Sequence, residues 1–301
     1  MNSAQTPTSP RAWARLELAG AALCFGLMAI LARKLTQPGI GFTAGHLSVI
    51  RFVVGLLLSL AAFQAWPGLY RPGNVRLLVL RGLSGGLVVV LYFFALSRIP
   101  AGEAGILYNL FPVFATAMAL YLFRERPTIH LLVAVAADSV GVVMVLGQGG
   151  ASLALRLGPG EIAALAAAVF AAVSANAIRA ARPTDNAPTI FFFFCLAGLP
   201  VVLPFALDPW PLHLGAWLLA LLMSVLAFAG QILMAQAYGA LSVAEAAIWL
   251  QLMPVTQYLL AVPLLGERAT GAGLLGVLLA VTGVAYGTIL GHRRSPAEAE
   301  G

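Results

Sequence analysis

The residues of this chain with the clearest chemical capacity are two amides that stand inside long apolar runs. Asn109 and Gln251 each lie three residues before a proline, Pro112 and Pro254 respectively. A proline inside a helix removes a hydrogen bond and frees the carbonyl four residues earlier, which in lipid must find a partner or line a wet cavity. We therefore predict hinges at the two prolines. The two amides either bind a ligand near the midplane or form hydrogen bonds between helices.

Polar side chains also recur at helical spacing. Ser224, Gln231 and Tyr238 follow one another at intervals of seven residues, which is about two helical turns, so they lie on one face of a helix. A polar face of this kind should point toward protein or water. Aromatic rings with a few amides suit an amphipathic organic ligand, although Tyr238 and Trp249 fit an interfacial aromatic belt equally well. The predicted substrate-binding residues are Tyr92, Tyr108, Asn109, Ser174, Gln231, Tyr238, Trp249, Gln251 and Tyr258.

Few ionisable residues fall deep inside the apolar runs. Asp138 lies near the middle of one run, so its carboxyl must be neutral, paired or facing a cavity, and it is a candidate for proton coupling. Arg51 and His46 lie near the start of another run. They could meet a substrate carboxylate, or the arginine could snorkel to the interface. The small amount of buried charge favours a neutral or zwitterionic solute.

Charged residues at the starts of helices and in short connections form a repeated structural motif. Ser242 stands three residues before Glu245, which is a capping-box pattern, and we predict helix capping rather than a transport role for that glutamate and its counterpart. For the Glu-Arg pairs in the short connections we predict a structural role, in which they hold paired helices together. The motif consists of Glu103, Glu245, Glu125, Arg126, Glu267 and Arg268.

Two segments, residues 91–142 and 233–284, are copies of one another at a constant offset of 142 positions. The matched residues include helix breakers and polar groups as well as Leu and Ala: Glu103 with Glu245, Pro112 with Pro254, Thr128 with Thr270, and Gly141 with Gly283. An internal repeat of this kind is typical of duplicated membrane transporters.

Composition excludes a soluble domain. The chain has 301 residues, of which 61% are hydrophobic and only 9% charged, and no soluble protein could cover such a core with polar surface. Its net charge of +6 comes from basic residues between apolar runs, which are topology signals rather than a nucleic-acid surface. Cys24 and Cys195 lie in separate runs, so no disulfide is expected. No catalytic motif, metal site or cofactor is predicted.

The apolar runs predict an all-α integral membrane protein with ten transmembrane helices. The predicted spans are 16–34, 44–64, 75–97, 101–123, 128–147, 159–180, 187–207, 213–238, 243–264 and 270–290. They form repeats at 16–147 and 159–290, with cytoplasmic tails at 1–15 and 291–301. An N-terminus inside the cell places eleven basic residues on the inner face and six on the outer. Each repeat then has five helices. Because five is an odd number, the second repeat must cross the membrane upside down relative to the first.

The repeated stretches resemble the drug/metabolite transporter superfamily, EamA type. They read AGEAGILYNLFPVFATAMALYLFRERPT and VAEAAIWLQLMPVTQYLLAVPLLGERAT. The first departs from the family pattern at Phe123-Arg124, where Leu-Gly is frequent. The resemblance implies inverted five-helix repeats around a central cavity, and export or exchange of small metabolites by alternating access. Amino acids, aromatic ones among them, are the narrower expectation.

The expected partners are a small-molecule substrate and the lipid bilayer, without nucleic acid, in a multi-pass protein of the inner membrane. A monomer and a homodimer remain open. The rival interpretations are an integral-membrane enzyme that acts on lipid-like substrates, and a membrane scaffold that transports nothing.

Overall fold

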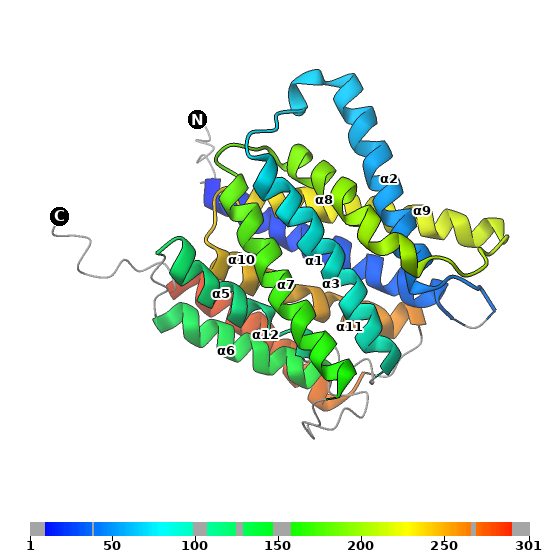
Figure 1. Cartoon of the computed structure of the whole chain (residues 1–301). Helices are drawn as coiled ribbons and strands as arrows, with labels where there is room; N and C mark the ends of the chain where they lie inside the picture. Colours follow the sequence, from blue (N-terminus) through cyan, green and yellow to red (C-terminus); the bar gives the residue numbers. More distant parts are fainter. Residues whose placement is uncertain are drawn as a thin grey trace, which may run out of the picture.

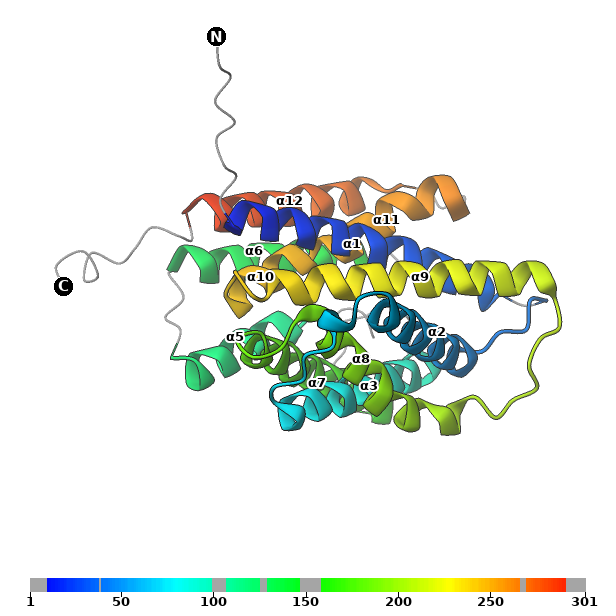
Figure 2. The same ribbon diagram turned by 90° about the horizontal axis from the view of Figure 1, so that it is seen from above.

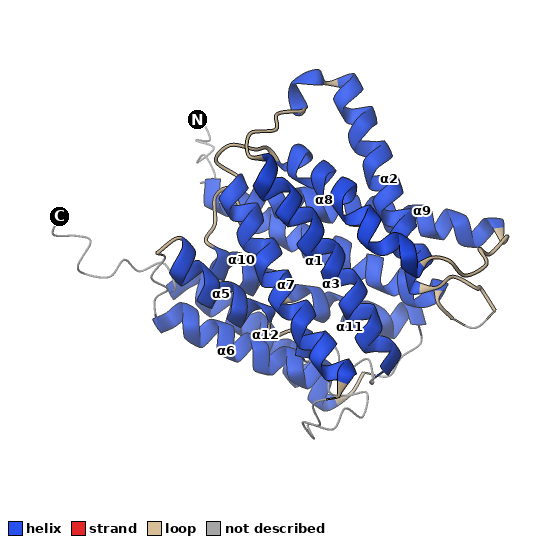
Figure 3. Cartoon of the chain, in the orientation of Figure 1, coloured by secondary structure: helices blue, strands red, loops and turns tan. Residues whose placement is uncertain are grey.

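The computed structural model describes residues 10–37, 39–98, 107–124, 129–146, 158–265 and 269–290. All regular structure in these ranges is helical (Figure 3). Five residues of the predicted repeat motif lie outside the described residues: Glu103, Glu125, Arg126, Glu267 and Arg268. Most of the two predicted tails lies outside them as well.

The described helices follow the predicted spans closely. Their bounds are α1 Pro10–Leu35, α2 Ala44–Ala65, α3 Val75–Arg98, α5 Phe111–Leu122, α6 Ile129–Leu146, α7 Pro159–Ala181, α8 Ala187–Val202, α9 Leu214–Ala237, α10 Val243–Leu250, α11 Leu252–Leu265 and α12 Gly271–Leu290. Short 3-10 turns, η1 Pro67–Leu69 and η3 Leu203–Phe205, follow α2 and α8. Figure 1 shows the arrangement of these elements.

Length and apolar composition suit these helices to a bilayer. Seven segments of the described chain are long and apolar enough to cross a membrane, and three shorter apolar helices supply the remaining predicted spans. Apart from the two broken spans described next, two boundaries differ from prediction by more than one residue. The first helix begins at Pro10 rather than residue 16, and α8 ends at Val202 because Pro200 and Pro204 interrupt regular hydrogen bonding there.

The two spans that carry the paired prolines are broken, and the predicted geometry of the break needs correction. Pro112 and Pro254 do not lie inside continuous helices. Each lies in the first turn of a new helix, α5 or α11, where a missing N–H costs little. The interruption itself falls at Asn109 and at Gln251, which are equivalent under the 142-residue offset.

Equivalent helices of the two repeats pack antiparallel, which is the packing that inversion requires. His130, at the start of α6, contacts Tyr286, near the end of α12, with 2.7 Å between Nδ1 and the hydroxyl oxygen. In the other such pair, Gly45 at the start of α2 lies against Phe205 beyond the end of α8. Two copies of one helix can meet antiparallel only when the second copy is turned over. The two repeats therefore have opposite directions in the bundle.

The other interhelical contacts have the same symmetry. In each half, the first helix packs on the third helix of the other half, so that α1 lies on α9 and α7 lies on α3. Likewise α2 packs on α8, and α6 packs on α12. The bundle is thus built from contacts between halves. Figure 2 shows α1 starting and α12 ending at the same end of the molecule, as an even number of crossings requires.

Small residues allow the closest of these contacts. Gly82 and Gly86 of α3 lie against the backbone of α8 at Phe193 and Gly198. The sequence predicts close approach at this GxxxG pair but leaves open whether a second chain provides the partner. In the structure the partner is α8 of the same chain.

Candidate substrate site between the two halves

Arg81 is the centre of the polar interior. It lies two turns into α3, and only 4% of its surface is exposed. Its Nη1 donates a hydrogen bond to Oγ of Ser174 on α7 at 2.5 Å, and its Nη2 donates one to Oε1 of Gln231 on α9 at 2.9 Å. One guanidinium therefore joins three helices from both halves of the chain.

A phenylalanine ring brings a second arginine to the same place. The Cζ atom of Arg81 lies 4.1 Å from the ring centre of Phe194 on α8, and that of Arg51 on α2 lies 5.8 Å from it. Both distances allow cation–π attraction. Gly85 makes room for this arrangement, because a Cβ there would collide with Nη1 of Arg81 and with the Phe194 ring.

These two arginines correct two predictions. Arg81 is one of the eleven basic residues assigned to the inner face from the sequence, and the interior is expected to hold little charge. Instead Arg81 is buried, and the half-buried Arg51 faces Phe194. The sequence contains no local signal for this placement, because the partners of Arg81 lie 93 and 150 residues away.

Tyrosines complete the surroundings of the two arginines. The ring centres of Tyr92 and Tyr108 are 4.8 Å apart. Tyr108 and Tyr238 are both close enough to Arg81 to interact with it electrostatically. Tyr238 is fully buried, and its hydroxyl has no hydrogen-bond partner among the described residues. Four of the predicted substrate-binding residues, Ser174, Gln231, Tyr108 and Tyr238, thus lie around Arg81, and a fifth, Tyr92, adjoins Tyr108.

The other four predicted residues lie at or near the broken helices. Asn109 is 7% exposed, and Gln251 is 1% exposed with neither side-chain amide atom partnered within the described chain. Trp249 lines a cavity of about 370 Å³ between α10 and α12. The hydroxyl of Tyr258 accepts a hydrogen bond from the backbone N–H of Thr270 at 2.9 Å, which ties α11 to the start of α12.

His46 does not join Arg51 as a ligand-binding group. Its Nδ1 accepts a hydrogen bond from the backbone N–H of Thr43 at 3.2 Å, and its Nε2 lies 3.0 Å from the carbonyl oxygen of Asp208. Together with Thr43 it forms a capping box at the start of α2. Both ring nitrogens are therefore engaged in structural contacts.

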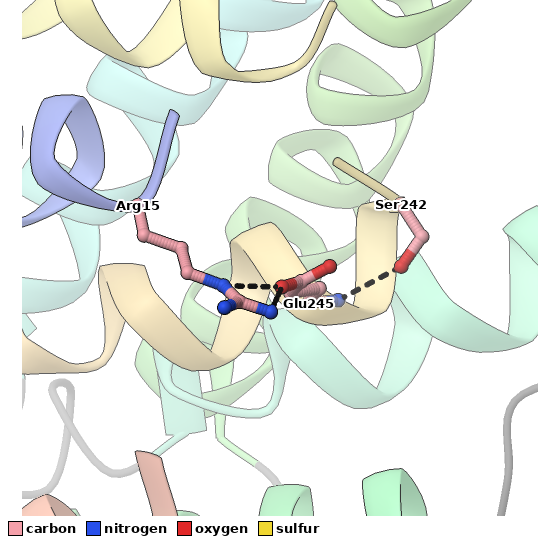
Figure 4. A network of polar contacts seen from close by, with 3 residues as sticks. All are labelled: Arg15, Ser242 and Glu245. Atoms are coloured by element: carbon pink, nitrogen blue, oxygen red, sulfur yellow. Dashed lines mark hydrogen bonds and ion pairs between the residues drawn. The ribbon is translucent and has the colours of Figure 1, made fainter. Parts of the chain in front are cut away.

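Glu245 combines capping geometry with an interhelical ion pair (Figure 4). Ser242 Oγ accepts a hydrogen bond from the Glu245 backbone N–H at 3.2 Å, at the start of α10. Nε and Nη2 of Arg15, on α1, each lie 2.9 Å from Oε1 of Glu245. The ion pair joins residues 230 positions apart, and no sequence pattern indicates it.

Asp138 lies on α6, and its side chain is outside the described part of the structure. α6 packs against α12, α10 and α11. Proton coupling through this carboxyl therefore stays a prediction.

The polar cluster around Arg81 is covered by protein in this structure. A cavity of about 240 Å³ lies at the ends of α2, α3 and α8, where Ser48, Phe94 and Phe205 are among its lining residues. Neither this cavity nor the one beside Trp249 reaches Arg81. Because Arg81, Ser174 and Gln231 are buried, we expect that helix movement is needed before a solute can contact them.

Comparison with known proteins places this architecture in a family. The model of the EamA-like transporter family matches residues 13–147 and again residues 158–288, nearly the whole of both halves. The chain belongs to the EamA-like transporter family. The predicted resemblance to EamA-type drug/metabolite transporters is thereby confirmed, and the chain is a multi-pass membrane transporter. Family membership favours transport over catalysis as the activity.

Relatives of this EamA-like transporter include the protein named "Pseudopaline exporter CntI" in two Pseudomonas aeruginosa strains, PAO1 and UCBPP-PA14. Each is 28% identical over 224 residues, which is 72% of this chain and 75% of the relative. A solved structure titled "Crystal structure of protein" has a TM-score of 0.79 with 24% identity. The match covers 94% of this chain and all of the other. That similarity shows the shared fold.

Proposed function

We propose that this protein exports or exchanges a small amphipathic organic metabolite across the inner membrane. In this proposal both termini are cytoplasmic, and the site around Arg81 opens alternately to the two sides. The observation that carries the proposal is the convergence of Arg81, Ser174 and Gln231, from three helices and both halves, on one buried point. Binding sites of transporters with inverted repeats lie at such an interface.

The chemistry of the surrounding side chains supports an organic solute. Phe194, Tyr92, Tyr108 and Tyr238 provide aromatic surface, and amides and hydroxyls provide polar contacts. Amino acids, aromatic ones among them, fit these surroundings. The relatives named as exporters support outward movement.

The broken helices supply the flexibility that this proposal requires. The breaks at Asn109 and Gln251 interrupt backbone hydrogen bonding at equivalent points in the two halves, directly before Pro112 and Pro254. We assign hinge roles to these prolines. We assign the side-chain amide of Gln251, which has no partner in the described structure, to a contact that forms in another conformation of the transporter. A proton taken up by Asp138 is the proposed source of coupling energy.

Counterflow of radiolabelled amino acids into liposomes that contain the purified protein tests this function. We expect saturable uptake for at least one solute, and Gln231→Ala should lower the initial rate at least tenfold because it removes a partner of Arg81. Gln236→Ala is the matched control, since Gln236 lies on the same helix with an exposed side chain. Absence of flux across a broad metabolite panel would favour an enzyme or a scaffold. Equal rates for the two variants would contradict the assigned site.

A further inference from the structure

The interior contains two guanidinium groups for which the described residues provide no carboxylate. Arg51 and Arg81 face the same Phe194 ring, and neither forms an ion pair with an acidic residue of the described chain. The partners of Arg81 are a neutral hydroxyl and a neutral amide. Burial of cationic groups away from water is costly unless an anion accompanies them. Among the residues that the structure describes, none therefore supplies negative charge to this cluster.

Hydrogen-bond donors of both arginines remain unused. Nε of Arg81 is buried and donates to no atom of the described chain, although Nη1 and Nη2 are engaged. Nε of Arg51 is likewise buried without a partner. In the described part of the structure, the Arg51 guanidinium approaches the Phe194 ring and forms no ion pair with a carboxylate. The guanidinium fork of Arg51 and the Nε–H of Arg81 are thus available to a ligand.

We propose that these donors form a carboxylate-binding site, so that the transported metabolite is an organic acid or amino acid held by its carboxylate. Arg51 forms the paired hydrogen bonds and Nε of Arg81 adds a third. Ser174 and Gln231 fix Arg81 in place, and the aromatic rings of Phe194 and the tyrosines hold the apolar part of the ligand. This inference rests on the proposed transport function and specifies its substrate class.

The donor geometry favours a carboxylate over other groups. A guanidinium fork matches the two coplanar oxygens of a carboxylate and binds them with two parallel hydrogen bonds. A phosphate ester would bring a third oxygen and more charge than one guanidinium fork pairs with, whereas Nη1 and Nη2 of Arg81 are held by Ser174 and Gln231. An uncharged solute would leave both cations uncompensated. Of the neutral and zwitterionic solutes expected from the sequence, the zwitterionic ones provide the carboxylate that this site requires.

Three ligands with the same phenylethyl body test the site. These are 3-phenylpropionate, its amide 3-phenylpropanamide, and 2-phenylethyl phosphate. Binding is measured on the purified full chain in nanodiscs by isothermal titration and by the ligand-dependent rise in the midpoint of thermal unfolding. We expect the acid to bind about tenfold more tightly than the amide, as charge-assisted hydrogen bonds require, and more tightly than the phosphate.

Arginine variants connect this preference to the proposed residues. Arg51→Gln should reduce the preference for acid over amide to within about twofold, as should Arg81→Gln. Arg51 donates no hydrogen bond to another residue of the described chain, so its replacement leaves the hydrogen bonds of the described fold intact. Arg76→Gln, an exposed position on the same helix as Arg81, should retain the full preference.

The outcomes separate this inference from the function on which it rests. Equal binding of acid and amide, tighter binding of the phosphate, or a preference that survives both arginine substitutions would overturn the carboxylate site. Flux of non-acidic solutes with no acid preference would overturn it and leave transport intact. Acid-selective binding without flux of any carboxylate would instead support the site and count against the transport proposal.

Discussion

At the scale of single residues, the interior depends on where a few charged side chains find partners. Glu245 is 1% exposed, and Arg15 places a cation at its carboxylate. Arg15→Gln should therefore lower the free energy of unfolding by about 1–3 kcal/mol, since a buried carboxylate would lose its cation. The effect is smaller than for a fully buried pair because the Arg15 side chain is 23% exposed.

Reversible unfolding in mixed detergent micelles measures this loss. Arg11→Gln on the same helix is the control, because Arg11 is exposed, and it should change stability by less than about 0.5 kcal/mol. Equal effects of the two substitutions would show that the ion pair between α1 and α10 contributes nothing to stability.

The sequence identifies the polar members of the candidate site better than its charged members. Ser174, Gln231 and Tyr238 stand out because polar residues on apolar helices must face protein or water. Arg81 is missed for a physical reason. A basic residue two turns from a helix end is equally compatible with the interface and with burial, and its placement depends on hydroxyl and amide partners supplied by α7 and α9.

At the scale of helices, close packing of α3 on α8 holds the arginine-bearing segment in place. A Cβ at Gly82 would lie 2.6 Å from the carbonyl oxygen of Phe193 and 2.5 Å from Cβ of Ala197. Because a backbone atom cannot move aside as a flexible side chain can, Gly82→Ala should lower the free energy of unfolding by about 1–3 kcal/mol.

The same unfolding assay tests this packing. Gly271→Ala provides the control, since a Cβ at Gly271 would have no atom within 4 Å. We expect its stability to stay within about 0.5 kcal/mol of the parent chain. A Gly82→Ala variant as stable as the parent would mean that α3 and α8 do not approach as closely as described.

Helix positions follow from the sequence because lipid imposes a minimum length on apolar segments. The span predicted at 159–180 corresponds to α7 at Pro159–Ala181, and that predicted at 128–147 corresponds to α6 at Ile129–Leu146. The split of the span 243–264 at Gln251 is not predicted. Proline was expected to bend a continuous helix there, whereas the chain ends one helix and starts another so that the proline lies in a first turn.

At the scale of the whole molecule, the inverted repeats provide a reason for two alternative conformations. The packing of α1 on α9 has its counterpart in the packing of α7 on α3. The equivalent helices α2 and α8, like α6 and α12, pack antiparallel. Because the two halves are related by inversion, we expect a conformation open at one end to have a counterpart open at the other. The covered cluster around Arg81 fits a state between these two.

Distances between spin labels at the two ends of the bundle test this account most directly. Labels at exposed Trp13 and Val75, at the starts of α1 and α3, report one end. Labels at exposed Ile162 and Leu214, at the starts of α7 and α9, report the other. In a background with Cys24 and Cys195 replaced by serine, double electron–electron resonance in liposomes should show two distance populations for each pair. The fraction of molecules with the first pair far apart should equal the fraction with the second pair close together, with and without 3-phenylpropionate. A single unchanged distance for both pairs, or two pairs that lengthen together, would contradict alternating access.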